Sequence, residues 1–323
     1  MRYLALRSLQ SLLLLLGVSL LSFVFVELAP GNFFDEMRLN PQISSETLAR
    51  LRTQYGMDQP LPVRYGRWLR AASKGELGFS FAYNSPVTPL LWSRVQNTLL
   101  LTGSSTLVAW LVALPLGILS AEKRGGWIDR VLTLITGALV ATPDLLLALF
   151  LLWLAVRTRW LPVGGMESLA SDQKSGWAQL KDLTAHLIAP VVVLVLGFLP
   201  TLLRHTRAAM IEALNSRCVR AARAHGISRM RILFRHALPV ALNPLVSFFG
   251  LSMGSLLSAS LLIEVVMGWP GLGPLLLEAI QGRDVYVVVG SVMFASLFLL
   301  FGALLGDALL VAVDPRVRAK RLA

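Results

Sequence analysis

Six stretches of this 323-residue chain are apolar over a length that can cross a lipid bilayer. A transmembrane helix needs about 20 mostly apolar residues, because the hydrocarbon core is roughly 30 Å thick. Only 15% of the residues are charged, whereas soluble domains carry roughly a quarter, so the chain lacks the charge to cover a water-facing surface. The sequence therefore predicts an all-α membrane protein with six transmembrane helices. The expected spans are about residues 9–29, 96–120, 131–156, 185–203, 240–263 and 286–313.

The first stretch shares features with a cleaved signal peptide, because Arg2 and Arg7 precede its apolar core. Its apolar length exceeds the roughly 7–15 residues usual for such peptides, and no small-x-small cleavage site follows it. The run ends instead on the helix-breaking sequence Leu28-Ala29-Pro30-Gly31. We therefore interpret it as a retained first transmembrane helix.

Positive charge is distributed unevenly between alternate loops. With the N-terminus in the cytoplasm, the cytoplasmic segments hold 17 Lys and Arg residues against four acidic residues. The opposite side holds 13 basic and twelve acidic residues, and eight of those basic residues lie in the long segment 30–95, which weighs little in the positive-inside rule. The rule therefore predicts that both termini are cytoplasmic. The same asymmetry accounts for the net charge of +12 without a nucleic-acid partner.

These spans divide the chain into three parts. Residues 1–95 hold the first transmembrane helix and a periplasmic segment, residues 96–313 hold a five-helix transmembrane core with a cytoplasmic loop at 204–239, and residues 314–323 form a cytoplasmic tail. The long loop is the most basic part of the chain.

The periplasmic segment is expected to be helical. Ser45 can cap a helix that runs to about residue 55, where Gly56 can end it. A second amphipathic stretch, residues 63–72, carries Tyr65 and Trp68 on one side with arginines interleaved. This pattern suits a helix at the membrane–water boundary, or equally an ordinary periplasmic helix packed on the spans.

The sequence contains no credible catalytic or metal-binding cluster. Gly250-Leu251-Ser252-Met253-Gly254 matches the G-x-S-x-G pattern of a nucleophile elbow, but it lies inside an apolar span rather than at a strand-to-helix turn. We expect these glycines, and the pair Gly302 and Gly306, to let helices approach closely. The four histidines have no metal-ligand spacing, Cys218 is the single cysteine, and no Walker A loop is present. If transport uses ATP, another subunit must bind it.

The loop at 204–239 has a helix–turn–helix pattern. Its stretch Val219–Ala224 is rich in alanine and arginine, Gly226 can end this helix in the left-handed conformation, and Ser228 can cap the next one. Leu238-Pro239 then begins the return into the membrane, since proline is tolerated in a first helical turn. The sequence predicts two short helices that project from the bilayer between spans four and five.

This loop resembles the E-A-A-x3-G-x9-I-x-L-P loop of permease subunits in bacterial ABC importers, and the chain is similar to the dipeptide/oligopeptide branch over nearly its full length. Two residues depart from this pattern: Arg220 stands in place of Glu at its first position, and His236 stands in place of Ile. The matching loop residues are Arg220, Ala221, Ala222, Gly226, His236, Leu238 and Pro239, with Arg223 beside them. Further matching stretches are 28–32, 55–62, 75–80, 160–162, 269–273 and 314–316.

The resemblance implies a permease subunit of the bacterial inner membrane that forms a pathway for peptides or similar small solutes. It also implies four kinds of partner: a second permease, two cytoplasmic ATPases that bind ATP and Mg²⁺, a periplasmic solute-binding protein and the lipid bilayer. The loop residues would then contact the ATPases. A stand-alone secondary transporter or channel is the alternative, although its usual inverted repeat of broken helices is not visible.

Two acidic residues are expected near membrane depth. Glu264 lies at the outer end of the fifth span, and Asp307 lies about two turns from the end of the sixth. Such residues are either pathway residues or packing and capping residues. The sequence does not choose between peptides, nickel complexes, glutathione, opines and oligosaccharides as the substrate.

Overall fold

The structure is a computed structural model that describes residues 2–28, 46, 50, 53, 58–168 and 176–313. Ser45, Gly56 and the tail 314–323, for which the sequence made predictions, lie outside the described residues. The chain forms two compact units. Unit 1 comprises residues 1–98 and 270–298, and unit 2 comprises residues 99–269 and 299–323.

In unit 1 the short helix α4 (Leu61–Ala72) packs on the long apolar helix α1 (Arg2–Leu28). The ring of Phe23 lies 5.4 Å from that of Tyr65 and 5.1 Å from that of Trp68, and Arg64 forms a 2.8 Å ion pair with Glu27. The aromatic side of the predicted amphipathic helix therefore packs on a span, as the second of the two sequence interpretations expected.

Unit 1 also contains a buried carboxylate, that of Asp284, next to a short β-hairpin. The strands β1 (Phe79–Ser80) and β2 (Ser85–Pro86) form an antiparallel hairpin. Asp284, which is 1% exposed, accepts hydrogen bonds from the Ser80 hydroxyl at 2.7 Å and from the Ala82 amide at 3.3 Å. The short apolar helix α12 (Leu272–Gln281) ends beside Asp284, whose amide donates to the Ala279 carbonyl at 2.8 Å, and it begins where the Leu272 amide donates to the Thr98 hydroxyl at 2.8 Å.

Unit 2 is a bundle of long helices. Its core is apolar and contains the fully buried side chains of Leu202, Ile263 and Trp269. The helices, in chain order, are α5 (Val87–Glu122, from residue 99 on), α6 (Trp127–Ala141), α7 (Asp144–Thr158), α8 (Gly176–Leu214), α9 (Arg217–Ala224), α10 (Arg229–Arg231), the π-helix η2 (Ile232–Ala237), α11 (Leu238–Met267) and α13 (Val285–Val313, from residue 299 on).

The glycine pairs that the sequence singled out lie where α11 and α13 touch. A Cβ atom at Gly250 would stand 2.7 Å from the carbonyl oxygen of Gly302, and one at Gly306 would stand 3.1 Å from the Cα of Gly250. Only hydrogen fits at such a separation, so the packing interpretation of these glycines is confirmed.

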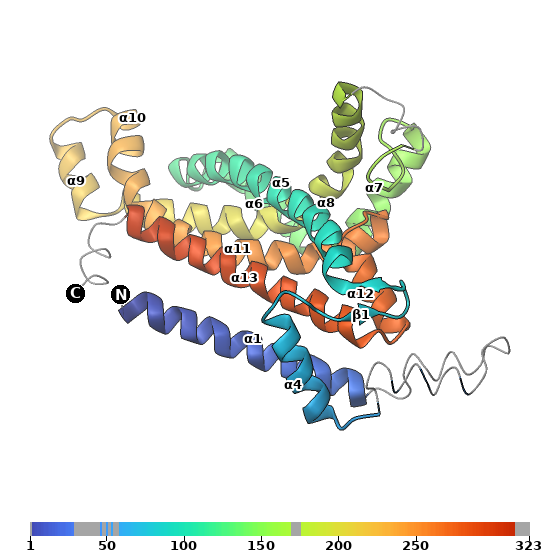
Figure 1. Ribbon diagram of the computed structural model, residues 1–323. Coiled ribbons are helices and arrows are strands. Elements are labelled where there is room, and N and C mark those ends of the chain that lie inside the picture. Colours follow the sequence, from blue (N-terminus) through green and yellow to red (C-terminus); the bar gives the residue numbers. More distant parts are fainter. Residues whose placement is uncertain are drawn as a thin grey trace. The chain divides into compact units, whose positions relative to one another are not determined.

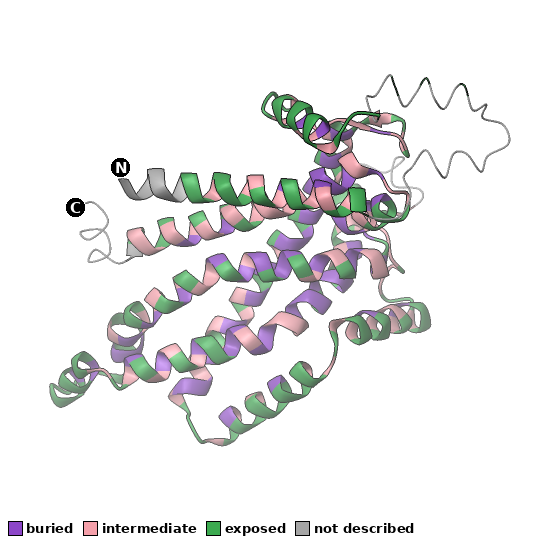
Figure 2. Cartoon of the chain, turned by 90° about the horizontal axis from the view of Figure 1, so that it is seen from below, coloured by how far each residue is buried: buried purple, intermediate pink, exposed green. Residues whose placement is uncertain are grey.

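Among the described residues, five helices are long and apolar enough to cross a membrane, and the count is six when the bent pair α6 and α7 is taken as one span. The all-α prediction is confirmed with five to six spans, but the third stretch is not straight: α6 and α7 meet at an angle of 96°. The break falls at Thr142-Pro143, because a proline ring cannot continue the helix that precedes it. The fourth helix is also longer than expected, since α8 runs on to Leu214. Figure 2 shows exposed faces along the spans, as expected of helices that meet lipid or other subunits.

Candidate functional site

The candidate site is the projecting hairpin between α8 and α11, formed by α9, α10 and η2 (residues 217–237). In Figure 1, α9 and α10 stand side by side beyond the ends of α8 and α11. Residues 204–214, which the sequence assigned to the loop, are instead the last turns of α8. The hairpin proper begins only after Asn215 and Ser216.

Local capping explains why α9 has these limits. The Ser216 hydroxyl accepts the amide of Val219 at 3.4 Å and so caps the helix start. At the other end the amides of Gly226 and Ile227 donate to the carbonyls of Arg223 and Ala222, at 3.0 and 3.2 Å. This pattern is a Schellman motif, which requires a left-handed residue at its turn. Gly226 supplies it, with φ of +70°.

The second half of the hairpin departs from a regular helix. Ser228 stands at the N-cap position of α10, but its side chain makes no capping hydrogen bond. Residues 232–237 then form a π-helix that contains His236, which is partly buried. Leu238 and Pro239 begin α11, as the sequence predicted. π-Helical turns are rare and occur mostly at functional sites, so this segment marks the junction between hairpin and span.

The two alanines of the motif point in different directions. Ala222 is 6% exposed and packs in a small core with Val219, Ile232 and Leu233, which joins the hairpin to α8 through Met210. Ala221 is exposed. A helix residue and its neighbour lie about 100° apart, so only one of the two can face inward. Contact with another subunit is therefore open to Ala221, whereas Ala222 is covered by the hairpin itself.

The outer face of the hairpin is positively charged. Arg217, Arg220 and Arg223 are all exposed. Arg217 and Arg220 line one cavity of about 540 Å³ together with Glu212 of α8. Arg223 and Arg229 line another of about 400 Å³ together with Glu122 at the end of α5. Guanidinium groups of this kind bind carboxylates bidentately, so the face suits an acidic protein surface.

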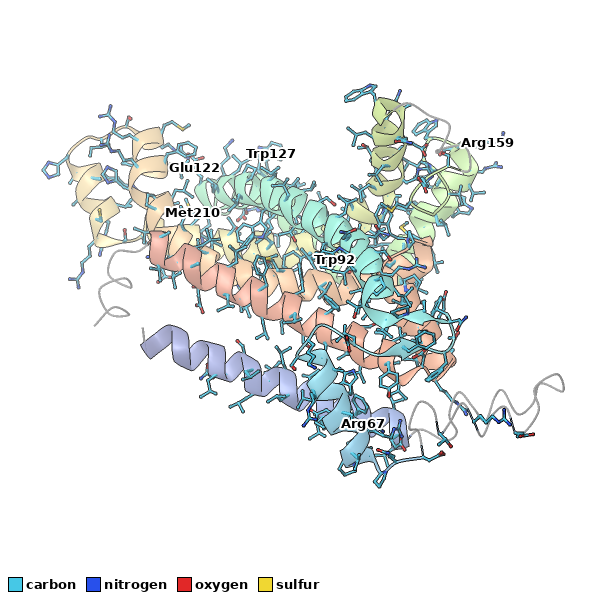
Figure 3. All side chains as sticks on the ribbon, in the orientation of Figure 1. Arg67, Trp92, Glu122, Trp127, Arg159 and Met210 are labelled. Atoms are coloured by element: carbon cyan, nitrogen blue, oxygen red, sulfur yellow. The ribbon has the colours of Figure 1, made fainter. Side chains whose placement is uncertain are left out.

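The structure adds two ion pairs that the sequence did not reveal. Arg229 Nε lies 2.6 Å from Glu122 Oε1 and so ties the hairpin to the end of α5. Arg207, on the last turns of α8, forms a bidentate pair with Asp129 of α6, with distances of 2.7 and 2.8 Å. These contacts place the turn at 123–126 and the hairpin at one end of unit 2, here called the hairpin end. Figure 3 labels Glu122, Trp127 and Met210 there.

The acidic residues inside the spans lie apart from the hairpin. Glu264 is completely buried near the end of α11, and Asp307 is partly buried on α13. A further acidic residue, Asp144, was not predicted as a candidate from the sequence; it begins α7 at the break in the third span. Its carboxylate abuts Gly197 of α8, where a Cβ would overlap it. The dipeptide Pro143-Asp144 within an apolar run was the available signal.

No cluster of three or more potential metal ligands occurs in the part of the chain that the structure describes. Together, the apolar spans and the basic hairpin define a multi-pass membrane protein with an exposed basic surface. Comparison with known proteins then specifies the family.

The family model "Binding-protein-dependent transport system inner membrane component" matches residues 113–319, and "Binding-prot-dependent transport system membrane comp, N-term" matches residues 1–102. The chain is 35% identical to the oligopeptide transport system permease protein AppB of Bacillus subtilis, over 98% of each chain. It is 33% identical to the dipeptide transport system permease protein DppB of Escherichia coli, over 95% of each, and 32% identical to the glutathione transport system permease protein GsiC of Shigella flexneri, over 94% of each.

The fold is also that of a solved transporter. A chain of the MetNI methionine ABC transporter, in an inward-facing conformation, matches with a TM-score of 0.57 at 22% identity, covering 70% of this chain and 96% of that one. The protein therefore belongs to the family of binding-protein-dependent transport system inner membrane components. It is a multi-pass inner-membrane protein and a transmembrane permease subunit of an ABC importer.

Proposed function

We propose that the chain forms, with a second permease subunit, the translocation pathway for peptides or chemically similar small solutes. A solute-binding protein delivers the solute from the periplasm. Two ATPase subunits bind ATP and Mg²⁺ in the cytoplasm and contact the hairpin. The peptide class is supported by three relatives of nearly equal length, whose names specify oligopeptides, dipeptides and glutathione.

One observation carries the proposal: the hairpin is anchored on one face and open on the other. Its inner face packs on α8 through Val219 and Ala222. Its outer face exposes Ala221 one turn after Arg217, with Arg220 beside them. A small side chain flanked by arginines lets a partner surface approach closely while its carboxylates pair with the guanidinium groups. A short helix held in this way transmits a push from a partner to the spans.

The contact is tested with Ala221→Glu. A glutamate adds both bulk and a negative charge to a fitted contact, and overpacking alone typically costs about 1–3 kcal/mol. We expect the ATPases to co-purify poorly with this variant and ATP-dependent uptake of labelled alanyl-alanine into proteoliposomes to fall, whereas Ala221→Ser should behave like the wild type. Normal attachment and uptake in Ala221→Glu would rule out this face as the docking surface.

The substrate class is tested on the same proteoliposomes, with the cognate binding protein present. Unlabelled di- and tripeptides should compete with labelled alanyl-alanine, and a nickel chelate and an oligosaccharide should not. Competition by either of the latter, without competition by peptides, would overturn the peptide assignment and leave the permease assignment intact.

The orientation is tested by labelling intact cells with an impermeant thiol reagent. A cysteine at the exposed Ser73, introduced in a Cys218→Ser background, should react from the periplasm, while native Cys218 in the hairpin should react only after lysis. The opposite pattern would reverse the topology and remove the hairpin from the reach of cytoplasmic ATPases.

A further inference from the structure

At the hairpin end, but outside the hairpin itself, the carboxylate of Asp129 accepts four hydrogen bonds. Asp129, in the first turn of α6, is 5% exposed. Its Oδ1 accepts from Arg207 Nε at 2.7 Å and from the Ser120 hydroxyl at 2.5 Å, and its Oδ2 accepts from Arg207 Nη2 at 2.8 Å and from the Gly125 amide at 2.9 Å. A carboxylate has about four acceptor sites, so this one is saturated.

The four bonds join three helices and one turn. Ser120 belongs to α5, Gly125 to the turn after it, Asp129 to α6 and Arg207 to α8. The carboxylate, guanidinium and amide groups involved have strongly directional bonding geometry, so a shift of one helix along another would break several bonds at once. We call these four residues, Ser120, Gly125, Asp129 and Arg207, the joint.

Close backbone packing reinforces the joint. Thr206, next to Arg207, is completely buried. A Cβ atom at Gly117 of α5 would lie 2.6 Å from the Cβ of Thr206, so α5 and α8 touch through a glycine one turn before Ser120. Helices in such contact rotate or slide only by separating, because the threonine side chain occupies the notch that the glycine leaves.

The joint lies close to the base of the hairpin. Arg207 precedes the end of α8 at Leu214 by seven residues, which is roughly 10 Å at 1.5 Å per residue. The apolar core of the hairpin contains Met210 and Ala213 of the same helix and Ala121 of α5. A displacement of α9 therefore reaches the joint through only two turns of helix.

We propose that Asp129 and Arg207 are positioning residues that fasten the ends of α5, α6 and α8 into one rigid body. A push on the hairpin then moves three helices together and not α8 alone. The inference rests on the proposed role of the hairpin as the ATPase contact. Charge serves this purpose because a buried carboxylate with all its acceptor sites filled fixes one relative arrangement of the groups that donate to it.

The first test measures coupling in the assembled importer, which contains this chain with its partner permease, ATPase and binding-protein subunits. The readout is the factor by which the binding protein stimulates ATP hydrolysis, normalised to assembled complex. Asp129→Asn keeps the size of the side chain but removes its charge, and we expect the stimulation to fall by about tenfold, the equivalent of one charge-assisted hydrogen bond. Arg207→Lys keeps the positive charge but loses the bidentate geometry of the guanidinium group. Its stimulation of ATP hydrolysis should lie between that of Asp129→Asn and that of the wild type.

The matched control is Lys123→Gln, which removes an exposed charge from the same turn and leaves the joint intact. Its stimulation should equal that of the wild type. If Asp129→Asn assembles and couples normally, the proposal is wrong. If the importer that carries Asp129→Asn does not assemble, coupling is measured in Arg207→Lys instead. Normal coupling in that variant overturns the proposal.

The second test reads rigidity without reference to transport. Spin labels at Trp127, which is 74% exposed, and at the exposed Arg223 span the joint in a Cys218→Ser background. One narrow distance distribution is expected in the wild type and a broad one in Asp129→Asn. An unchanged distribution in Asp129→Asn overturns the proposal, and so does a broadened one with normal coupling. If Ala221→Glu shows that the hairpin is not the ATPase contact, this arm still reports on the joint, so the two failures are distinguishable.

Discussion

At the two ends of unit 2, the helices are held together by different kinds of contact. At the hairpin end, charged side chains join the helices: Asp129 with Arg207, and Glu122 with Arg229. At the opposite end, the backbones themselves make the contact. The Gly165 amide donates to the Met267 carbonyl at 3.1 Å, and the core beneath them contains Trp269 with no exposed surface.

Glycine serves a different purpose at each end. Gly164 has a positive φ of +73°, and a Cβ there would stand 2.8 Å from the Met267 carbonyl oxygen, so both its conformation and its lack of a side chain matter. Gly226 also has a positive φ, of +70°, but a Cβ there would meet nothing within 4 Å. Gly164 therefore tolerates no added atom, whereas Gly226 leaves room for a side chain and requires only its left-handed conformation.

The largest expected effect is on stability, from Gly164→Val. The substitution forces a β-branched residue into the left-handed region and drives its Cβ against a carbonyl oxygen. Strain and overlap each cost about 1–3 kcal/mol, so the loss is roughly 2–6 kcal/mol. We expect lower membrane abundance and a lower melting temperature of the purified protein.

The matched control is Gly165→Val. Gly165 also has a positive φ, of +77°, but the nearest atom to a Cβ there is 3.9 Å away, so only strain applies. Equal losses in the two variants would show that the close approach at Gly164 contributes nothing, and the contrast between the ends would weaken.

Gly226→Val should have a smaller effect on stability and a larger one on transport. A valine in the left-handed region costs about 1–3 kcal/mol, and the open space leaves no overlap to add. The hairpin would relieve this strain by losing the left-handed turn, which sets the direction of α10 relative to α9. We expect near-normal membrane abundance with little ATP-dependent uptake. Gly226→Asn, which adopts the left-handed conformation more readily, should retain most uptake. Wild-type uptake in Gly226→Val would remove the turn from the coupling mechanism.

The features predicted from the sequence are those that depend on local pattern. Apolar runs gave the six spans, because a bilayer imposes a minimum length on each helix. Gly226 and the Leu238-Pro239 start of α11 follow from capping rules that involve only neighbouring residues. The motif residues of the hairpin could be identified for the same reason.

What the sequence did not reveal depends on contacts between distant residues. Asp129 and Arg207 are 78 residues apart, and nothing in their neighbourhoods indicates that they pair. The opposite orientations of Ala221 and Ala222 became clear only once Val219, Ile232 and Leu233 were seen to form a core. The bend in the third span was hidden because α6 and α7 together still form one apolar stretch long enough to cross a membrane, although Pro143 between them was a local warning.

The smallest expected effect is that of Glu122→Gln. Its pair with Arg229 joins the hairpin to the end of α5, whereas the joint ties α5 and α6 to α8, and Arg229 keeps 70% of its side chain exposed. Water screens such a pair and the long side chains lose entropy in forming it, so exposed ion pairs contribute about 0–1 kcal/mol. We expect Glu122→Gln to lower the melting temperature slightly and to leave uptake within about twofold of the wild type, since a twofold change corresponds to well under 1 kcal/mol. A loss as large as that of Gly226→Val would mean that an exposed ion pair contributes as much at this end of unit 2 as the buried joint does. The contrast between the saturated carboxylate of Asp129 and the pair of Glu122 with the exposed Arg229 would then fail as an account of how the helices of this end are held together.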